Sequence, residues 1–327
     1  MSGAHDAAVA ARGARAVVAV VGPTATGKSD LGLELALRLG GEVVNADAMQ
    51  LYRGMDVGTA KLRPHERRGV PHHQLDVLDV AEDASVAAYQ RHARADLADL
   101  AARGARAVVV GGSGLYLRAL LDHMEFQPVD EQVRAELERE AAERGPGLLH
   151  DELARLDPVA AARIDRANTR RVVRALEVVR ITGRPYSASL PEHVYEVPAV
   201  QIGLDSARPV LDERIERRVA RMWDDGLVAE VTGLAGRMGR TARRAVGYAE
   251  VLRMLDGELD ETAARAAVTT GTRRLARRQM GWFGRDPRVH WLDAADPDLV
   301  ARALELVAAA DAGRLAEPTY VRRTLGS

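Results

Sequence analysis

The sequence of 327 residues contains no cysteine, which excludes disulfides, thiolate zinc sites, iron–sulfur clusters and a cysteine nucleophile together. No apolar run approaches the ~18 residues that a membrane-spanning helix requires. The first 15 residues lack the apolar segment of a secretory signal peptide. We therefore expect a cytoplasmic protein that does not enter a membrane.

The chain also lacks an excess of charge of either sign, because 46 Lys and Arg residues are balanced by 47 Asp and Glu residues. A uniformly basic protein is thereby excluded, although local basic faces are not. With 47% apolar and 28% charged residues the composition is that of an ordinary globular protein. The length suggests roughly two domains of about 100–200 residues each.

Short apolar runs alternate with helical patterns in the first part of the chain. Strands are expected at 16–21, 42–45, 105–110, 200–204 and 289–292. Helices are expected at 31–39, 85–103 and 115–121, the second with Ser85 as its N-cap. This alternation predicts an α/β fold with a parallel sheet covered on both faces.

A phosphate-binding motif follows the first expected strand. It matches G-x-x-x-x-G-K-[ST] and comprises Gly22, Pro23, Thr24, Ala25, Thr26, Gly27, Lys28 and Ser29. The glycines let backbone N–H groups turn toward phosphate oxygens, and the next helix presents its positive N-terminus. Lys28 adds a charge, and Ser29 is placed to hold Mg²⁺. The hydroxyls of Thr24 and Thr26 either reach the phosphates or hold the loop's own backbone.

Residues 130–182 have helical patterns, with breaks at 144–147 and 157–158 and no strand pattern. We therefore expect a P-loop NTPase-like parallel sheet core at 16–122 and 199–315, whose C-terminal part is helical. A helical insertion domain is expected at 123–198 and a flexible tail at 1–15.

Asp47 lies just beyond the second expected strand, where residues of a parallel sheet face the ligand crevice. It can coordinate Mg²⁺, act as a general base or cap the next helix. The third expected strand ends in Val110-Gly111-Gly112-Ser113 and so lacks the Walker-B aspartate of a nucleoside triphosphatase. ATP or GTP hydrolysis is therefore disfavoured as the main chemistry.

Arginines cluster in three segments. Arg163, Arg166, Arg170 and Arg174 would share one helix face if that helix is continuous, and further groups lie at 240–244 and 273–278. Clustered arginine suits a nucleic-acid backbone, whereas the alternative is a solvated face paired with acidic residues. The neighbouring histidines His72 and His73 lack zinc-type spacing, which favours a structural role.

Together these segments resemble the bacterial tRNA dimethylallyltransferase (IPP transferase) family. The matching stretches are GPTATGKS at 22–29, NADAMQLYRGMDVGTAK at 45–61, PHHQLD at 71–76, VVVGGSGLYLRALL at 108–121, DPVAAARIDRANTRRVVRALEV at 157–178, LDERIERRV at 211–219, AVGYAE at 245–250 and TRRLARRQMGWF at 272–283. They depart from the family pattern at Ala48, where a serine is common, and at Ser113, where a threonine is common.

The resemblance implies transfer of the dimethylallyl group from dimethylallyl diphosphate to N6 of adenosine-37 in tRNA, with Mg²⁺ as the cofactor. The products would be N6-isopentenyladenosine and diphosphate, and the phosphate loop would bind the diphosphate rather than ATP. It also implies that Asp47 is the general base, that Thr24 lies beside the bridging oxygen of the diphosphate, and that Arg214 helps to bind the diphosphate.

The resemblance further implies a tRNA-binding surface for the anticodon stem-loop, with the helical insertion as a mobile domain that closes on it. The residues concerned are Asp47, Ala48, Met49, Gln50, Ser113, Arg134, Arg170, Arg171, Val172, Val173, Arg174, Arg244, Ala245, Val246, Gly247, Tyr248 and Ala249. We expect the protein to act as a monomer.

Two alternatives stay open at this point. A small-molecule or nucleotide kinase would explain the phosphate loop, Asp47 and some arginines, but neither the basic C-terminal helix nor the full set of motifs. An RNA-binding P-loop switch protein is a second alternative, and the missing Walker-B acid argues against it.

Overall fold

The computed structural model describes residues 15–124, 126–189, 193–316 and 318. The chain forms two compact units: one comprises the residues up to Leu121 and from Tyr195 onward, and the other is Asp122–Val194. The helical insertion was expected at 123–198. Apart from Arg15, the expected tail at 1–15 lies outside the described residues.

The larger unit is built on a sheet whose six described strands are all parallel, in the order β3-β2-β4-β1-β5-β6. The strands are β1 (Val17–Val21), β2 (Gly41–Asn45), β3 (His72–His73), β4 (Arg106–Val110), β5 (Ala199–Asp205) and β6 (Val289–Asp293). Apolar runs predicted all of them except β3. That strand has two residues, both histidines, and therefore carries no apolar pattern.

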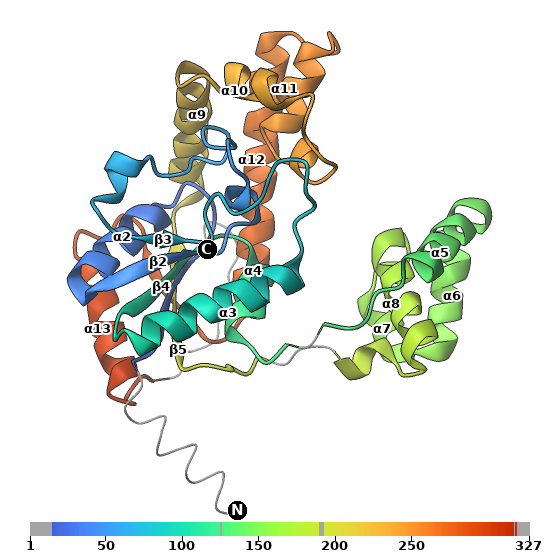
Figure 1. Ribbon diagram of the computed structural model, residues 1–327, viewed down its shortest axis with the longest axis horizontal. Coiled ribbons are helices and arrows are strands. Elements are labelled where there is room, and N and C mark those ends of the chain that lie inside the picture. The colour runs from blue at the N-terminus through green and yellow to red at the C-terminus, as the bar shows by residue number, and fades with distance from the viewer. Residues whose placement is uncertain (1–14, 125, 190–192, 317, 319–327) are drawn as a thin grey trace, which may run out of the picture. The chain divides into compact units, whose positions relative to one another are not determined.

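Helices cover both faces of this sheet, as expected (Figure 1). They are α2 (Lys28–Leu39) and α13 (Leu299–Asp311) on one face, and α3 (Val86–Ala102) and α4 (Gly114–Leu121) on the other. Because side chains alternate along a strand, Val18 and Val20 of β1 pack in the cluster with α2 and α13, whereas Ala19 and Val21 pack in the cluster with α3 and α4. The predicted N-cap is confirmed, since Ser85 Oγ accepts the N–H of Ala88 at 3.3 Å.

A further group of helices packs beyond the sheet in the same unit (Figure 1). It consists of α9 (Arg208–Asp224), α10 (Leu227–Leu234), α11 (Tyr248–Leu255) and α12 (Glu261–Phe283), with the short 3₁₀ helix η4 (Ala242–Arg244). Their core includes Ile215, Tyr248 and Val268, and it also takes in Tyr52 and Met55 from the segment after β2. This segment begins with the 3₁₀ helix η1 (Ala48–Leu51), and the later 3₁₀ helix η2 (Pro64–Arg67) precedes β3.

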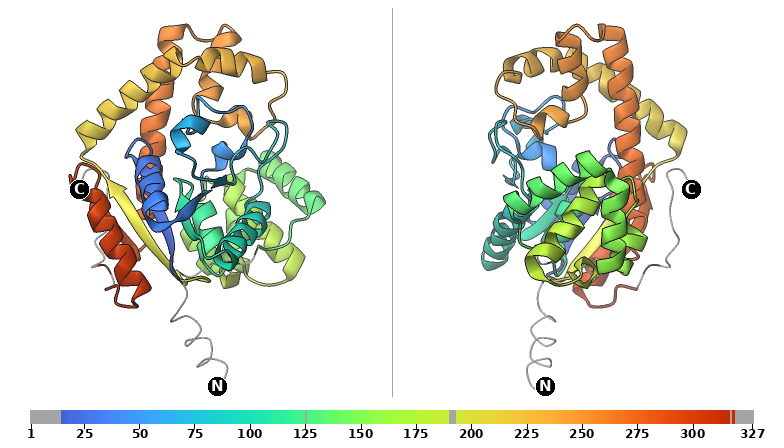
Figure 2. Two further views of the ribbon diagram at one scale, coloured as in Figure 1. Left: turned by 60° about the vertical axis from the view of Figure 1, so that its left-hand side comes forward. Right: turned by 90° about the vertical axis from the view of Figure 1, so that its right-hand side faces the viewer.

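The smaller unit is helical (Figure 2). It has its own hydrophobic core. Its elements are α5 (Glu131–Arg144), α6 (Pro146–Leu156), α7 (Pro158–Arg163), α8 (Thr169–Thr182) and the 3₁₀ helix η3 (Tyr186–Ser189). Both predicted breaks are present, and Pro146 and Pro158 stand at the starts of the helices that follow them. Proline suits the first helical turn because its missing N–H is unpaired there in any case.

A third break between α7 and α8 was not expected. The turn after Arg163 ends where Asn168 accepts the N–H of Arg171 at 3.2 Å and so caps α8. Arg163 therefore does not share a helix with Arg170 and Arg174, and the continuous arginine face on which the sequence interpretation depended is absent from the described residues.

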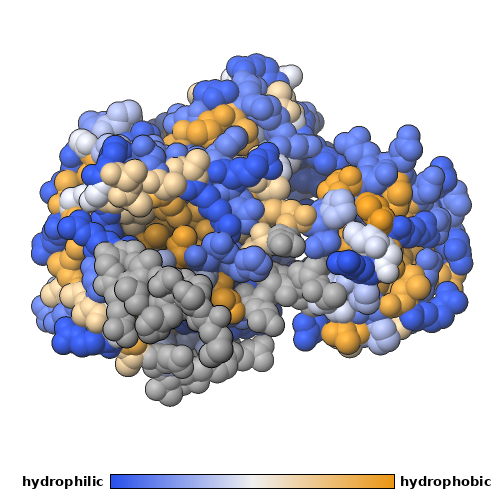
Figure 3. All heavy atoms as spheres, turned by 60° about the horizontal axis from the view of Figure 1, so that its bottom comes forward, coloured by the Kyte–Doolittle hydropathy of each residue, from blue (hydrophilic) through white to orange (hydrophobic). Residues whose placement is uncertain are grey.

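On the face shown in Figure 3, hydrophobic residues are interspersed with hydrophilic ones. Among the described residues, no helix is both long and apolar enough to cross a bilayer.

Candidate active site

Three loops meet at the carboxyl edge of the sheet, after β1, β2 and β4. The N–H of Ala46 donates to the carbonyl of Val110 at 2.8 Å, and the N–H of Gly111 donates to the carbonyl of Val20 at 3.2 Å. An added Cβ on Gly111 would lie 2.3 Å from the backbone of Ala46, so only glycine allows this approach. The phosphate loop, Asp47 and Ser113 are thereby brought together, as the strand order of a parallel sheet predicts.

The phosphate loop has the backbone that its glycines require. Gly22 has a φ of 129°, and an added Cβ there would lie 2.6 Å from the carbonyl oxygen of Leu204. Gly27, with a φ of 90°, is the N-cap of α2, and Ala25 also has a positive φ of 66°. The buried hydroxyl of Thr26 donates to the carbonyl of Pro23 at 2.8 Å. Of the two roles left open for Thr26, the structure shows the one within the loop.

Gln279 of α12 forms a hydrogen bond with the phosphate loop. Its Oε1 accepts the N–H of Thr24 at 2.8 Å. The side chain is buried, and an added Cβ on Gly112 would lie 2.2 Å from its Nε2. Gln279 thus lies between the phosphate loop and the turn after β4. Sequence reasoning missed this role, because nothing local marks a glutamine in a basic helix as a partner of a loop 255 residues away.

Lys28 begins α2, and its Nζ donates to the carbonyl of Pro23 at 2.5 Å. Burial lowers the pKa of Lys28 to about 7, the charge of Asp47 opposes this shift, and the charge of Arg218 adds to it. A bound anion would stabilise the protonated form and raise this pKa. The loop therefore presents a cation whose charge depends on what it binds.

Asp47 has one of the roles that the sequence left open, that of a cap. Its Oδ1 accepts the N–H of Met49 at 3.0 Å and so caps η1. Its charge also opposes the burial that lowers the pKa of Lys28 and of Arg218, so the carboxylate interacts electrostatically with both cations. Burial, Tyr52 and then Asp47 together raise the pKa of Tyr116 to about 12. Capping and a chemical role are compatible, because the cap uses one oxygen of the carboxylate.

Ser113 fixes the turn that carries Asp47. The N–H of Ala48 donates to Ser113 Oγ at 3.1 Å, and the N–H of Ser113 donates to the carbonyl of Ala46 at 3.2 Å. Both peptide neighbours of Asp47 are therefore attached to the same serine. A threonine would supply the same hydroxyl.

The arginine of α9 that interacts electrostatically with Asp47 is Arg218. Burial lowers the pKa of Arg218, the charge of Asp47 opposes the shift, and Nη2 donates to the carbonyl of Thr59 at 3.3 Å. Arg214 lies one turn earlier on α9 and makes no hydrogen bond or ion pair within the described part of the chain. Residues four apart share a helix face, so the sequence could not choose between these two arginines.

Met49 and Gln50, two further predicted tRNA contacts after β2, are half-buried. Gln50 Nε2 donates to the carbonyl of Thr59 at 3.1 Å.

Ser29, the predicted Mg²⁺ ligand, is half-buried in the first turn of α2. In the ranges that the structure covers, no group of three His, Asp or Glu side chains forms a metal cluster. His73 instead contacts Glu42 at 2.6 Å, which agrees with the structural role expected for the two histidines.

In the smaller unit, two residues predicted to contact tRNA form ion pairs within the unit. Arg134 and Arg174 donate to the fully buried carboxylate of Glu177 at 2.9 and 2.8 Å. Arg174 also donates to the carbonyls of Gln127 and Pro128. Val172 and Val173 lie in the core, so Arg170 and Arg171 are the exposed side chains of this predicted segment.

The second segment predicted to contact tRNA, residues 244–249 in the larger unit, likewise contains both exposed and buried residues. Arg244 is exposed, and Val246 and Ala249 are half-buried. Ala245 and Tyr248 are buried, and Gly247 is the buried N-cap of α11. Arg244 is therefore the side chain in this segment that is best placed to meet a nucleic acid.

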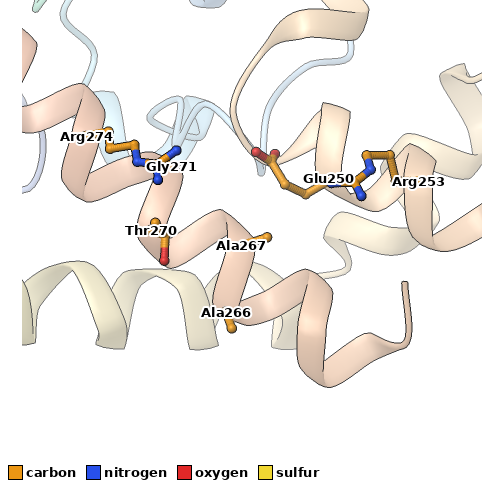
Figure 4. Close-up of a pocket in the computed structure, with 7 residues that line it drawn as sticks. All are labelled: Glu250, Arg253, Ala266, Ala267, Thr270, Gly271 and Arg274. Atoms are coloured by element: carbon orange, nitrogen blue, oxygen red, sulfur yellow. The ribbon is translucent and has the colours of Figure 1, made fainter. Parts of the chain in front are cut away.

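A separate hollow of about 360 Å³ lies between α11 and α12 (Figure 4). Its lining is Glu250, Arg253, Ala266, Ala267, Thr270, Gly271 and Arg274. Glu250 accepts the N–H of Gly247 and Arg253 pairs with Glu258, so its charged groups already have partners in part. None of the predicted catalytic residues lines this hollow.

Comparison with known proteins identifies relatives over most of the chain. The family model described as IPP transferase matches residues 50–286. The chain is 60% identical to the tRNA dimethylallyltransferase of Thermobifida fusca over 299 residues, which cover 89% of this chain and 94% of that protein. It is 58% identical to the tRNA dimethylallyltransferase of Streptomyces coelicolor over 297 residues, covering 89% and 95%.

Solved structures agree with these matches. The tRNA isopentenylpyrophosphate transferase of Bacillus halodurans superposes with a TM-score of 0.67 and 40% identity, covering 92% of this chain and 97% of that chain. A eukaryotic dimethylallyltransferase acting on tRNA gives a TM-score of 0.81 and 25% identity, covering 94% and 82%. The prediction of a P-loop-like parallel sheet core is confirmed.

Proposed function

This chain belongs to the IPP transferase family, and from that premise we infer that it is a tRNA dimethylallyltransferase. It transfers the dimethylallyl group of dimethylallyl diphosphate to N6 of adenosine-37 and releases diphosphate. The observation that supports the mechanism is the electrostatic interaction of one carboxylate, Asp47, with the two cations Lys28 and Arg218. The kinase alternative is not favoured, because relatives 57–60% identical carry the transferase name.

Asp47 is the general base of this mechanism. The exocyclic amine of adenine is a weak nucleophile because its lone pair is delocalised into the ring. Asp47 takes a proton from N6 as the bond from N6 to the allylic carbon forms, and such proton transfer contributes ~10²–10⁴-fold. The carbon–oxygen bond to the diphosphate breaks in the same step, and its electron pair leaves on the diphosphate oxygen.

The leaving group is bound by cations and backbone amides. Lys28, Arg218 and the N–H groups of residues 22–29 neutralise the charge that develops on the diphosphate. The Thr24 hydroxyl lies beside the bridging oxygen. We propose Arg218 for the role first expected of Arg214, and its electrostatic interactions with Lys28 and Asp47 support this proposal.

Ser29 is the residue that would hold Mg²⁺. This half-buried serine in the first turn of α2 suits a cation that keeps several water and phosphate ligands and needs few protein ones. When bound, Mg²⁺ would neutralise diphosphate charge and make it a better leaving group.

The tRNA partner is the anticodon stem-loop, bound by the protein as a monomer in the cytoplasm. Specific RNA recognition concentrates on single-stranded loops, and adenosine-37 must leave its stack to reach Asp47. Arg170, Arg171 and Arg244 are exposed and suited to its phosphates.

Mass spectrometry of adenosine-37 tests the activity directly. The protein is incubated with tRNA, Mg²⁺ and dimethylallyl diphosphate, and in parallel with ATP in place of the diphosphate. We expect the dimethylallyl adduct in the first reaction and no phosphoryl transfer in the second. Phosphoryl transfer from ATP without any prenyl adduct would overturn the proposal.

A further inference from the structure

The loop after η1, residues 54–61, is anchored by one acidic side chain from a distant helix. The carboxylate of Glu230 on α10 accepts three consecutive backbone N–H groups, from Asp56 at 2.9 Å, Val57 at 2.7 Å and Gly58 at 3.2 Å. It also accepts the hydroxyl of Tyr248, at 2.5 Å. One carboxylate thus binds four donors from two separate parts of the chain.

Successive N–H groups that converge in this way form an anion-binding nest, and in this protein Glu230 fills it. Tyr248 closes the arrangement, because its buried ring packs closely against the loop: an added Cβ on Gly58 would lie 2.4 Å from Cε2 of Tyr248. Burial and the nearby Glu230 charge raise the pKa of Tyr248, so its hydroxyl remains a proton donor. The loop is therefore held by charge and by shape.

The other end of the same loop touches the candidate active site. The carbonyl of Thr59 accepts from Nη2 of Arg218 at 3.3 Å and from Nε2 of Gln50 at 3.1 Å. Hydrogen bonds within the loop hold this carbonyl, because the N–H of Ala60 donates to the carbonyl of Val57 at 3.0 Å and the N–H of Lys61 donates to the carbonyl of Asp56 at 3.0 Å. The buried Lys61 Nζ also pairs with Asp56 and Asp76. A shift at residues 56–58 would therefore move the Thr59 carbonyl.

Arg218 depends on that carbonyl for its orientation. Its Nε is buried without a hydrogen-bond partner in the described part of the structure, whereas its Nη2 donates to Thr59. A guanidinium stabilises a developing charge only when it is aimed at that charge before the reaction. Without the Thr59 carbonyl in place, Arg218 would be free to take other rotamers.

We propose that Glu230 is a positioning residue for prenyl transfer: by filling the nest at residues 56–58 it fixes the Thr59 carbonyl, which aims Arg218 at the diphosphate. The proposal rests on the function inferred above. Glu230 does not touch the reacting atoms in this scheme, and it acts only through the loop and Arg218.

A double-mutant cycle between Glu230 and Arg218 tests this role. Glu230→Gln keeps the shape of the side chain but replaces one acceptor oxygen by an NH2 group, which cannot accept the N–H groups of the loop. Single-turnover prenyl transfer and the KM for dimethylallyl diphosphate are measured for wild type, Glu230→Gln, Arg218→Gln and the double variant. We expect Glu230→Gln to slow transfer by roughly tenfold in the wild-type background and by less than about twofold in the Arg218→Gln background.

Asp311→Asn is the matched control. Asp311 on α13 pairs with buried Arg106 at the start of β4, at the opposite edge of the sheet from the phosphate loop. Its loss lowers stability but should leave single-turnover transfer unchanged well below the melting temperature. If Glu230→Gln does not fold, Tyr248→Phe is the second variant, because it removes one donor to Glu230 and leaves the three backbone donors of the nest in place. We expect Tyr248→Phe to slow transfer by less than Glu230→Gln does, and to have no effect in the Arg218→Gln background.

The outcomes separate this proposal from the function on which it rests. A wild-type protein that transfers no prenyl group overturns the proposed function. A wild type that transfers normally, with Glu230→Gln slowing transfer by the same factor with and without Arg218, overturns the positioning role alone.

Discussion

The carboxylate of Asp47, after β2, raises the pKa of Lys28 at the start of α2, against the burial that lowers this pKa to about 7. Two residues 19 positions apart in sequence thus interact at the carboxyl edge of the sheet. The relationship matters for catalysis because a diphosphate must be neutralised while a base remains unprotonated nearby. In the proposed mechanism Lys28 and Arg218 neutralise the diphosphate, and Asp47 accepts the proton of the amine.

Asp47→Asn should cut turnover by ~10²-fold or more, because an amide cannot accept the N6 proton. Folding should be preserved, since asparagine is as good a cap for η1 as aspartate. Single-turnover rates and tRNA affinity, measured side by side, check this prediction. Near-normal turnover combined with a collapse of tRNA affinity would show that Asp47 is a binding residue instead.

Binding of dimethylallyl diphosphate should take up a proton above about pH 7. Free Lys28 has a pKa near 7, whereas phosphate groups lose their last proton near pH 6, so at pH 8 the ligand must protonate the lysine. Affinity should therefore fall as pH rises above 7. Calorimetry at pH 8 in buffers of different ionisation enthalpy measures the uptake, which Lys28→Met should abolish; equal heats in all buffers would contradict the assignment.

The same shift has a consequence for the ligand-free protein. The unfolded chain binds a proton at Lys28 up to its usual pKa of 10.5, whereas the folded chain releases it near 7. The contribution of Lys28 to the free energy of unfolding should thus become more favourable as pH rises from about 7 toward 10.5. Denaturant titrations of wild type and Lys28→Met over this range check the sign, and any stability advantage of the variant should shrink with rising pH.

Arg218→Gln should lower kcat/KM for dimethylallyl diphosphate by ~10²-fold, because it removes a preorganised charge at the leaving group. Arg214→Gln, one turn away on the same face of α9, should change it by no more than a few-fold. Steady-state kinetics with varied diphosphate and saturating tRNA compare the two. The reverse ranking would restore Arg214 as the diphosphate ligand.

Arg170→Ala should reduce the salt dependence of tRNA binding, because this exposed arginine is free to meet a phosphate. The slope of log affinity against log salt should shrink by on the order of 0.7–0.9 for each phosphate that is no longer neutralised. Fluorescence titrations of tRNA at several salt concentrations measure the slope. An unchanged slope for both Arg170→Ala and Arg171→Ala would mean that this face is only solvated.

Arg174→Ala should instead destabilise the smaller unit. Burial tends to raise the pKa of Glu177, but hydrogen bonds from Arg174 and Arg134 outweigh it and leave the pKa lowered. The pair therefore stabilises the fold above the ordinary pKa of a glutamate and loses this effect as pH falls through the lowered value. Thermal unfolding between pH 3 and 7 should show a deficit for the variant that narrows at low pH; a constant deficit would argue against the ion pair.

The sequence by itself determined the elements that depend on neighbouring residues. Continuous apolar runs marked β1, β2, β4, β5 and β6, and the spacing of glycine, lysine and serine marked the phosphate loop. Asp47 could be placed at the ligand edge because it follows a strand of a parallel sheet, and that placement needs only strand order. The break before α8 had a local mark as well, since Asn168 is a typical N-cap, but the arginine spacing suggested a continuous helix.

Only the tertiary structure decided which groups face one another across long separations. Arg214 and Arg218 share one helix face, and the carbonyl of Thr59, 159 residues earlier than Arg218, distinguishes them. Glu230 reaches the loop at residues 56–58 from more than 170 residues away, and Arg174, expected to bind tRNA, is a partner of buried Glu177. Such pairings follow from packing and from the cost of leaving buried charges and N–H groups unpaired, which no pattern within a single segment reveals.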